Sequence, residues 1–210
     1  MKLSIVSTKG GPGKTTTAMH LAQALTRHGT VDVWDADPQG SATEWAALAE
    51  DDGNPLDFDV RPVNARTLER AAAGKGITTD HVVIDTPPGH PSIIEAAIRA
   101  ADVVIVPTEA SAMDMTRMWR TIDATGDTPR IVLITKAVPR TRSHRTALDA
   151  LAAAEAPVFD TCIPRREPIK NTYGTRLRSD RLHGYDDVLR ELATALGIDL
   201  PADLASTEGA

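Results

Sequence analysis

Short apolar runs alternate with amphipathic stretches along most of the chain. Continuous runs of Val, Ile and Leu are typical of strands buried on both faces, and apolar residues at helical spacing predict helices between them. The predicted strands are Leu3–Ser7, Val31–Asp35, Phe58–Val63, His81–Asp85, Asp102–Pro107, Ile131–Thr135 and Val158–Ile163. The predicted helices are Lys14–His28, Ser41–Leu48, 65–73, Ile93–Ala101, Ala112–Ala124, Ser143–Ala154 and Asp186–Leu196.

Residues at the helix ends agree with this division. Ser41, Asn64 and Ser143 are candidate N-caps, and Gly29 and Gly197 stand where helices should end. The alternation predicts an α/β fold with a mostly parallel sheet flanked by helices on both faces. In such folds ligands bind beyond the carboxyl ends of the strands. Polar residues at those ends are therefore the first functional candidates.

No internal repeat or linker interrupts the pattern, and 210 residues suit one domain. We expect that domain to span residues 1–200 and residues 201–210 to form a flexible tail. Hydrophobic residues make up 41% of the chain and charged residues 25%, a globular composition. No apolar run approaches the roughly 20 residues of a membrane span. The N-terminus turns polar too early for a signal peptide, so we expect a cytoplasmic protein.

The cysteine count excludes several classes of protein. Cys162 is the only cysteine, so the chain forms no internal disulfide. Zinc sites and iron–sulfur clusters that need paired thiolates are excluded for the same reason. Chemistry must therefore come from other residue types.

The richest chemical signal follows the first predicted strand, in the run Lys-Gly-Gly-Pro-Gly-Lys-Thr-Thr at positions 9–16. Glycines let backbone N–H groups approach phosphates closely, and a helix N-terminus adds unpaired donors. Lys14 can reach the β- and γ-phosphates of a nucleotide, and the Thr15 hydroxyl can bind Mg²⁺. A strand, a glycine-rich turn and Gly-Lys-Thr on a helix together predict a P-loop NTPase.

Carboxylates stand at two further strand ends. The second predicted strand leads into Asp35-Ala36-Asp37-Pro38-Gln39-Gly40, and the fourth delivers Asp85 before Thr-Pro-Pro-Gly. Carboxylates facing a phosphate loop suit Mg²⁺ and water positioning. Asp85 occupies the Walker B position, where it would bind Mg²⁺ through water.

Together these motifs resemble the deviant Walker A ATPases of the ParA/MinD family, most of all the short, ParF-like plasmid partition proteins. The resemblance implies that Lys9 reaches across a dimer interface to the nucleotide of the partner. It implies that Asp37 helps to position the attacking water, so that Lys9, Lys14 and Asp37 are catalytic. Thr15, Asp37 and Asp85 would hold the metal. The expected cofactors are ATP or ADP and Mg²⁺.

The same resemblance gives a set of nucleotide-binding residues. It comprises the loop and two later positions that would pack against the base: Lys9, Gly10, Gly11, Pro12, Gly13, Lys14, Thr15, Thr16, Pro164 and Arg165. Two departures from the family pattern stand out. Thr8 occupies the position of the first glycine of the common P-loop, and Thr135-Lys136 stands where relatives often carry Asn. Adenine preference is therefore implied by the family and not by a residue.

Charge is distributed unevenly. Residues 136–181 carry ten basic and five acidic side chains, although the whole chain has a net charge of −6. Basic side chains of this kind are needed for sequence-independent DNA binding, and solvated loops would show them as well. ParA-type ATPases bind DNA non-specifically, so the resemblance implies DNA as a partner, with association to the nucleoid. No helix-turn-helix segment precedes the first strand, so we expect no operator-specific reading.

Several functions share this loop. The leading one is a partition ATPase that forms a homodimer or a larger assembly with ATP, hydrolyses ATP slowly alone and is stimulated by a ParB-type DNA-binding adaptor. Alternatives are a ParA-like ATPase that positions another cargo, and a small-molecule ligase or kinase. A membrane-bound regulator needs a basic amphipathic C-terminal helix, and residues 201–210 are acidic and small, so we expect no membrane partner.

Overall fold

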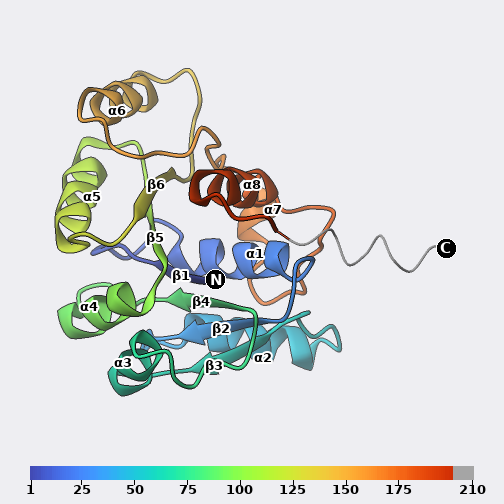
Figure 1. The fold of residues 1–210 in the computed structure, drawn as a ribbon. Helices are drawn as coiled ribbons and strands as arrows, with labels where there is room; N and C mark the ends of the chain where they lie inside the picture. Colours follow the sequence, from blue (N-terminus) through green and yellow to red (C-terminus); the bar gives the residue numbers. More distant parts are fainter. Residues whose placement is uncertain (201–210) are drawn as a thin grey trace.

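Six strands form one parallel sheet in the order β3-β2-β4-β1-β5-β6 (Figure 1). The computed structural model describes residues 1–200. The strands are β1 (Lys2–Ile5), β2 (Val31–Asp35), β3 (Asp59–Pro62), β4 (His81–Asp85), β5 (Val103–Thr108) and β6 (Arg130–Ile134). These are six of the seven predicted strands, each shifted by a few residues at most.

Helices cover both faces of the sheet. One face packs against α1 (Lys14–Leu25), α2 (Ser41–Asp51) and α8 (Tyr185–Leu196). The other packs against α3 (Ala65–Ala72), α4 (Pro91–Ala100) and α5 (Ala112–Ala124). Helix α6 (Arg142–Ala153) lies against α5 at the β6 edge, and the single turn α7 (Glu167–Lys170) lies between α6 and α8 in the chain (Figure 1).

Alternate residues of each strand feed opposite core clusters. Val103 and Ile105 of β5 pack on the side of α1 and α8, whereas Val104 and Val106 pack on the side of α4 and α5. Because successive strand residues point to opposite faces, an apolar run is what a doubly covered strand requires. The predicted α/β class with a parallel sheet is therefore confirmed.

The strand order places β1 between β4 and β5. The chain moves from β1 toward β2 on one side and later returns past β1 to β5 and β6 on the other. This reversal opens a crevice at the carboxyl ends of the strands, which is where ligands bind in open α/β sheets. The loop after β1 and the carboxylates Asp35 and Asp85 all stand at this edge.

The predicted seventh strand, Val158–Ile163, is wrong. The segment forms only isolated bridges near the β6 edge, from Val158 to Val132 and from Pro164 to Ala137. Between them, the backbone N–H groups of Asp160 and Thr161 donate to the Glu191 carboxylate of α8, at 2.8 and 3.0 Å. A side chain therefore satisfies the donors that a strand would offer to its neighbour.

Two predicted N-caps are also wrong. Helix α2 is preceded by Gly40 in the left-handed region (φ +68°), and Ser41 is its first helical residue. Helix α6 begins before Ser143, because the Thr141 side chain accepts a hydrogen bond from the His144 N–H. The predicted cap Asn64 is confirmed, since its side chain accepts from Thr67 N. Helix α7 was not predicted, and one turn is too short to show a helical period.

The predicted flexible tail, residues 201–210, lies outside the described part of the chain. Within residues 1–200, no helix combines the length and the apolar character that a membrane crossing requires.

Candidate nucleotide-binding site

The loop between β1 and α1 forms a cradle of backbone donors. Gly11 and Gly13 have φ values of +101° and +86°, a left-handed backbone that side chains rarely adopt. A Cβ atom at either position would meet no atom within 4 Å, so the need for glycine is conformational rather than steric. Gly13 is the N-cap of α1 and makes no side-chain capping bond. The first N–H groups of α1 are therefore left for an anion.

Three side chains, one from the start of α1 and two from the end of β6, donate hydrogen bonds to carbonyl groups of this loop. Lys14 Nζ donates to Lys9 O at 2.9 Å, and Thr135 Oγ1 donates to Pro12 O at 2.7 Å. Lys136 Nζ donates to Gly11 O at 2.5 Å. Since these contacts occupy the carbonyl groups, the polar groups that remain for a ligand are mainly N–H donors. Such a concave set of donors binds anions.

Lys14 is 7% exposed, although it is a lysine. Burial lowers the pKa of Lys14, and the negative charges of Asp85 and Asp37 oppose that effect. The ammonium group thus lies among carboxylates at the edge where the phosphate loop ends. The predicted contact of Lys14 with phosphates stays a prediction.

Asp85 is positioned to support a cation. Its Oδ2 accepts a hydrogen bond from Thr15 Oγ1 at 2.7 Å. Its Oδ1 is buried and accepts no hydrogen bond from residues 1–200. Burial raises the pKa of Asp85 to about 7, and the nearby Asp35 adds to that shift. A buried carboxylate oxygen without a donor fits a hydrated Mg²⁺ ion, whose positive charge would favour the ionised form.

Few protein ligands gather at this point. Among residues 1–200, no group of three or more His, Cys, Asp or Glu side chains is arranged to hold a metal. Mg²⁺ sites in nucleotide-binding proteins commonly use one or two protein groups and complete the shell with phosphate oxygens and water. Thr15 and Asp85 fit such a site.

The two aspartates after β2 have different environments. Asp35 is fully engaged: its Oδ2 accepts from Thr43 N and Thr43 Oγ1, both at 2.8 Å, and its Oδ1 accepts from Asp37 N at 3.1 Å. Asp37 Oδ1 accepts from Gln39 N at 2.9 Å, and the side chain is partly exposed. Asp35 thus fixes the loop, while Asp37 remains accessible at the crevice.

Lys9 forms an ion pair within its own chain. Its Nζ lies 2.7 Å from Asp114 Oδ1, and Asp114 Oδ2 accepts from Ser111 Oγ at 2.5 Å. Burial favours a higher pKa for Asp114, but the hydrogen bonds from Lys9 and Ser111 outweigh it and lower the pKa. The sequence did not predict this pair. The pattern Ser-x-x-Asp at 111–114 is a capping signature, which signalled the local contact but not the lysine.

A cavity of about 250 Å³ opens beside the cradle on the side of α8. Gly13 of the loop, Thr16 of α1 and Tyr185 of α8 line it. The predicted base contacts Pro164 and Arg165 also line it. A hydrogen bond from Arg165 N to Ala137 O, 3.0 Å long, ties that segment to the end of β6. The fold thus brings both predicted base contacts to the edge of the phosphate loop.

Comparison with known proteins agrees with this geometry. Residues 3–177 match the model of the CobQ/CobB/MinD/ParA nucleotide-binding domain. The chain belongs to this family. Membership confirms the predicted ParA/MinD relationship and the predicted class, a P-loop ATPase.

Individual relatives have different roles. A maintenance of carboxysome distribution protein A from Gloeobacter kilaueensis is 38% identical over 167 residues, 77% of this chain and 75% of the relative. A putative plasmid partition protein from Borrelia burgdorferi bound to AMPPNP superposes with a TM-score of 0.74 at 19% identity, covering 92% of this chain and 98% of that one.

A third neighbour is an enzyme of small-molecule metabolism. Cobyrinic acid a,c-diamide synthase from Mycobacterium smegmatis, with bound ADP and magnesium, gives a TM-score of 0.64 at 23% identity, covering 97% of this chain and 98% of that one. The two solved structures show the fold. Their bound ligands agree with the predicted cofactors, ATP or ADP and Mg²⁺.

Proposed function

We propose that this chain is an ATPase that dimerises with ATP and Mg²⁺ and uses the dimer to position a cargo in the cell. The observation that carries the proposal is the second lysine of the loop, Lys9, at the mouth of a complete phosphate cradle. Lys14 would supply the ammonium group that faces the phosphates of the nucleotide in its own chain. A second ammonium group at the mouth is suited to a nucleotide held by another copy of the chain.

The surface around Lys9 supports an interface. Met113, next to Asp114 in the first turn of α5, is 64% exposed, and Val138, in the loop after β6, is 48% exposed. Both stand beyond the carboxyl ends of the strands, at the same edge as the phosphate loop. Single exposed apolar side chains are common on protein surfaces, so these two support an interface only together with Lys9. A second copy placed against this edge would cover both.

Hydrolysis needs a positioned water, and Asp37 is the candidate. Its side chain is accessible, whereas Asp35 is held by Thr43 and fixes the loop. Bound Mg²⁺ would supply the positive charge that neutralises the phosphate oxygens. Thr15 and Asp85 would hold that charge in place. Asp37 would orient the water, and the assembled dimer would complete the water-excluding site.

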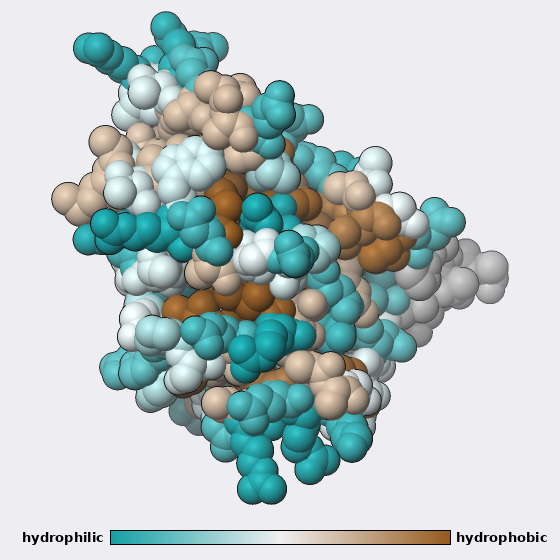
Figure 2. Space-filling view, turned by 60° about the vertical axis from the view of Figure 1, so that its left-hand side comes forward, coloured by the Kyte–Doolittle hydropathy of each residue, from teal (hydrophilic) through white to brown (hydrophobic). Residues whose placement is uncertain are grey.

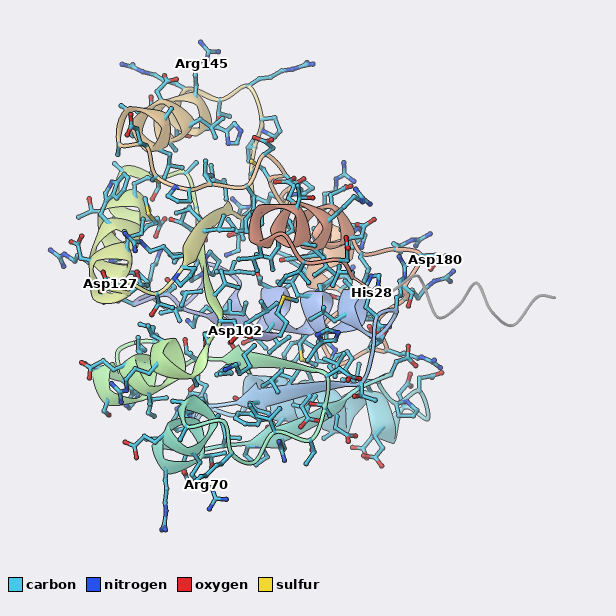
Figure 3. The ribbon with its side chains drawn as sticks, in the orientation of Figure 1. His28, Arg70, Asp102, Asp127, Arg145 and Asp180 are labelled. Carbon is cyan, nitrogen blue, oxygen red and sulfur yellow. The ribbon has the colours of Figure 1, made fainter. Side chains whose placement is uncertain are left out.

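DNA binding is supported best at α6. Arg140, Arg142 and Arg145 are exposed, and none forms an ion pair within residues 1–200. Figure 3 shows Arg145 pointing away from the fold, and the end of the molecule where α6 lies carries hydrophilic side chains in Figure 2. Three unpaired cations on one convex surface suit duplex phosphates, and would associate the protein with the nucleoid.

Three of the six basic residues in 165–181 are less available. Arg176 pairs with Asp57 at 2.5 Å, Arg178 with Asp180 at 2.7 Å, and Lys170 with Glu167 at 3.2 Å. Cations already paired within the chain release fewer counterions from DNA. We therefore assign the DNA contact first to the α6 surface. Arg165, Arg166 and Arg181 are exposed and form no ion pair within residues 1–200, so they are the later residues that could add to it.

The cargo has two candidates. One is a plasmid or chromosome, reached through a ParB-type DNA-binding adaptor. The other is a protein-based body reached through a different adaptor, and the relative named for carboxysome distribution, 38% identical, favours it. Both require the same nucleotide-gated dimer. The adaptor would thus determine the cargo.

Light scattering of the purified chain tests the proposal. It is measured with ADP, with ATP and Mg²⁺, and with each plus a short DNA duplex. A dimer or larger species with ATP alone, and a further shift with DNA, is the expected result. A monomer in every state would refute the proposal and favour a small-molecule enzyme that uses the same loop. A triple substitution of Arg140, Arg142 and Arg145 by Ala should remove the DNA step and keep the dimer.

A further inference from the structure

The loop after β6 contains a lysine with an unfavourable backbone conformation. Lys136 has φ +47°, in the left-handed region that favours glycine and asparagine. Position 136 nevertheless carries a lysine, whose side chain is 40% exposed. Within residues 1–200, Arg140, Glu155 and His183 also have a positive φ, so the backbone alone assigns no role to Lys136 and its contacts must do so.

The side chain of Lys136 makes two contacts. Its Nζ donates to Gly11 O at 2.5 Å and lies 2.9 Å from Glu109 Oε1, which follows β5. The exposed fractions are 40% for Lys136 and 28% for Glu109. A partly exposed ion pair adds little to stability, so the pair alone does not account for the strained backbone. The contact with the phosphate loop is the more informative one.

Gly11 lies at the centre of the cradle. It has a left-handed backbone, φ +101°, and a glycine there has many alternative conformations. The carbonyl group of Gly11 belongs to the Gly11–Pro12 peptide, which has no N–H because its nitrogen is that of proline. If this carbonyl turned toward the crevice, it would repel the phosphates. A positive charge that binds Gly11 O from outside holds the carbonyl away from the crevice and leaves the neighbouring N–H groups to face the place where phosphates would lie.

Lys136 also stands between the two halves of the site. It lines the cavity beside the cradle, together with Pro164 and Arg165, while its ammonium group binds the phosphate loop. The preceding residue, Thr135, binds the next carbonyl, that of Pro12, at 2.7 Å. The end of β6 thus holds two successive carbonyl groups of the loop.

We propose that Lys136 is a positioning residue for the polyphosphate of the nucleotide, with Glu109 as the group that aims it. This inference rests on the proposed nucleotide site. It assigns to Lys136 the task of holding the Gly11 carbonyl away from the phosphates, and it predicts an effect on the diphosphate part of the ligand that does not depend on the base.

The test compares Lys136→Asn with Lys75→Asn. Asparagine tolerates the left-handed backbone of position 136 and removes the ammonium group. Lys75 is an exposed lysine in the loop between α3 and β4, at the opposite edge of the sheet, and its substitution removes the same charge, so it is the control. Titration calorimetry measures the Kd for ADP and for inorganic pyrophosphate, and thermal unfolding without ligand measures Tm.

Lys136→Asn should weaken the binding of ADP and of pyrophosphate by the same factor, about tenfold, which corresponds to about 1.4 kcal/mol of binding free energy. The Tm of Lys136→Asn should match that of the Lys75→Asn control, and Lys136→Arg should recover most of the affinity. Equal affinities in the two Asn variants would overturn the proposal. So would a loss for ADP without a loss for pyrophosphate, since the effect would then lie at the base.

Glu109→Gln distinguishes the positioning of the Lys136 side chain from the effect of the Glu109 charge on the ligand. By charge alone, loss of a carboxylate beside the cradle should tighten the binding of a polyphosphate. If Glu109 aims Lys136, the same substitution should weaken it, and tighter binding would overturn the proposal. Wild-type protein that binds neither ligand would instead refute the proposed function, and the two failures are thereby distinguished.

Discussion

His20 gives a prediction whose size follows from the structure. It lies in α1, the helix that begins at the phosphate loop, and its side chain is 0% exposed. Nδ1 lies 2.8 Å from Thr16 O and must donate to it, while Nε2 is buried and has no partner within residues 1–200. The ring packs on Tyr185, with centroids 4.8 Å apart. Tyr185 in turn lines the cavity beside the cradle.

Burial lowers the pKa of His20 to about 4, and the nearby His183 acts in the same direction. In the unfolded chain the imidazole has its ordinary value of about 6.5. Below pH 6.5 the unfolded state therefore binds a proton that the folded state refuses until about pH 4. Stability falls as the pH falls through that window. His20 alone lowers the free energy of unfolding by about 2 kcal/mol at pH 5 relative to pH 8, and by about 3 kcal/mol near pH 4.

The perturbation is His20→Phe, which keeps a ring among Tyr185 and Trp45 and removes the titration. Urea unfolding at pH 8 and at pH 5 gives the free energy of unfolding for each protein. The decrease in the free energy of unfolding between pH 8 and pH 5 should be about 2 kcal/mol smaller in the variant than in the wild type. For a domain of this size, that difference corresponds to about 6 °C in Tm. Other histidines titrate in both proteins, so the comparison removes them.

His90→Gln is the control, since His90 is exposed and its loss should leave the wild-type pH profile in place. An identical loss in His20→Phe and in wild type would refute the assignment. It would mean that the imidazole is charged in the folded state or that the α1–α8 contact opens at pH 5.

Four substitutions in the cradle test the proposed roles. Lys14→Ala removes two charge-assisted hydrogen bonds and should weaken nucleotide binding by about a hundredfold or more. If calorimetry shows that the variant retains its affinity, Lys14 is not part of the cradle. Lys9→Ala should keep monomer affinity within about threefold and abolish the ATP-dependent dimer in light scattering; an unchanged dimer contradicts the cross-interface role. Asp114→Asn should raise the fraction of dimer at a limiting protein concentration. A lower fraction of dimer would indicate that the Lys9–Asp114 pair supports the loop instead. Asp37→Ala should slow hydrolysis by about 10²–10³-fold while dimers accumulate, and normal phosphate release would remove Asp37 from the mechanism.

The sequence predicted the scaffold of the site because local signals determine it. The apolar runs at Val31–Asp35 and His81–Asp85 end in the carboxylates that meet at the crevice, and periodicity alone predicted both strands. The left-handed glycines and the start of α1 follow from the composition of the loop. These features depend on residues within a few positions of one another.

Contacts between distant segments could not be predicted in this way. Lys9 meets Asp114 across 105 positions, and Lys136 meets Gly11 across 125. Periodicity predicts that the strand ends share one edge, but not which side chain reaches which carbonyl. The failed strand at Val158–Ile163 has the same cause, because the Glu191 carboxylate from a later helix takes the donors that pairing would have used.

The Lys9–Asp114 pair bears on how the proposed dimer forms. Asp114 is 9% exposed at its side chain and Lys9 is 33% exposed, so release of the lysine leaves a nearly buried carboxylate. Such a group needs another positive charge. Arg117, one turn further along α5, already lowers the pKa of Asp114 through its charge, and residues three apart on a helix face each other. With Arg117 and the Ser111 hydroxyl beside it, Asp114 keeps two favourable neighbours after Lys9 leaves. The release of Lys9 therefore costs less than the loss of a sole partner would, and a nucleotide phosphate on a second copy can compete for the lysine.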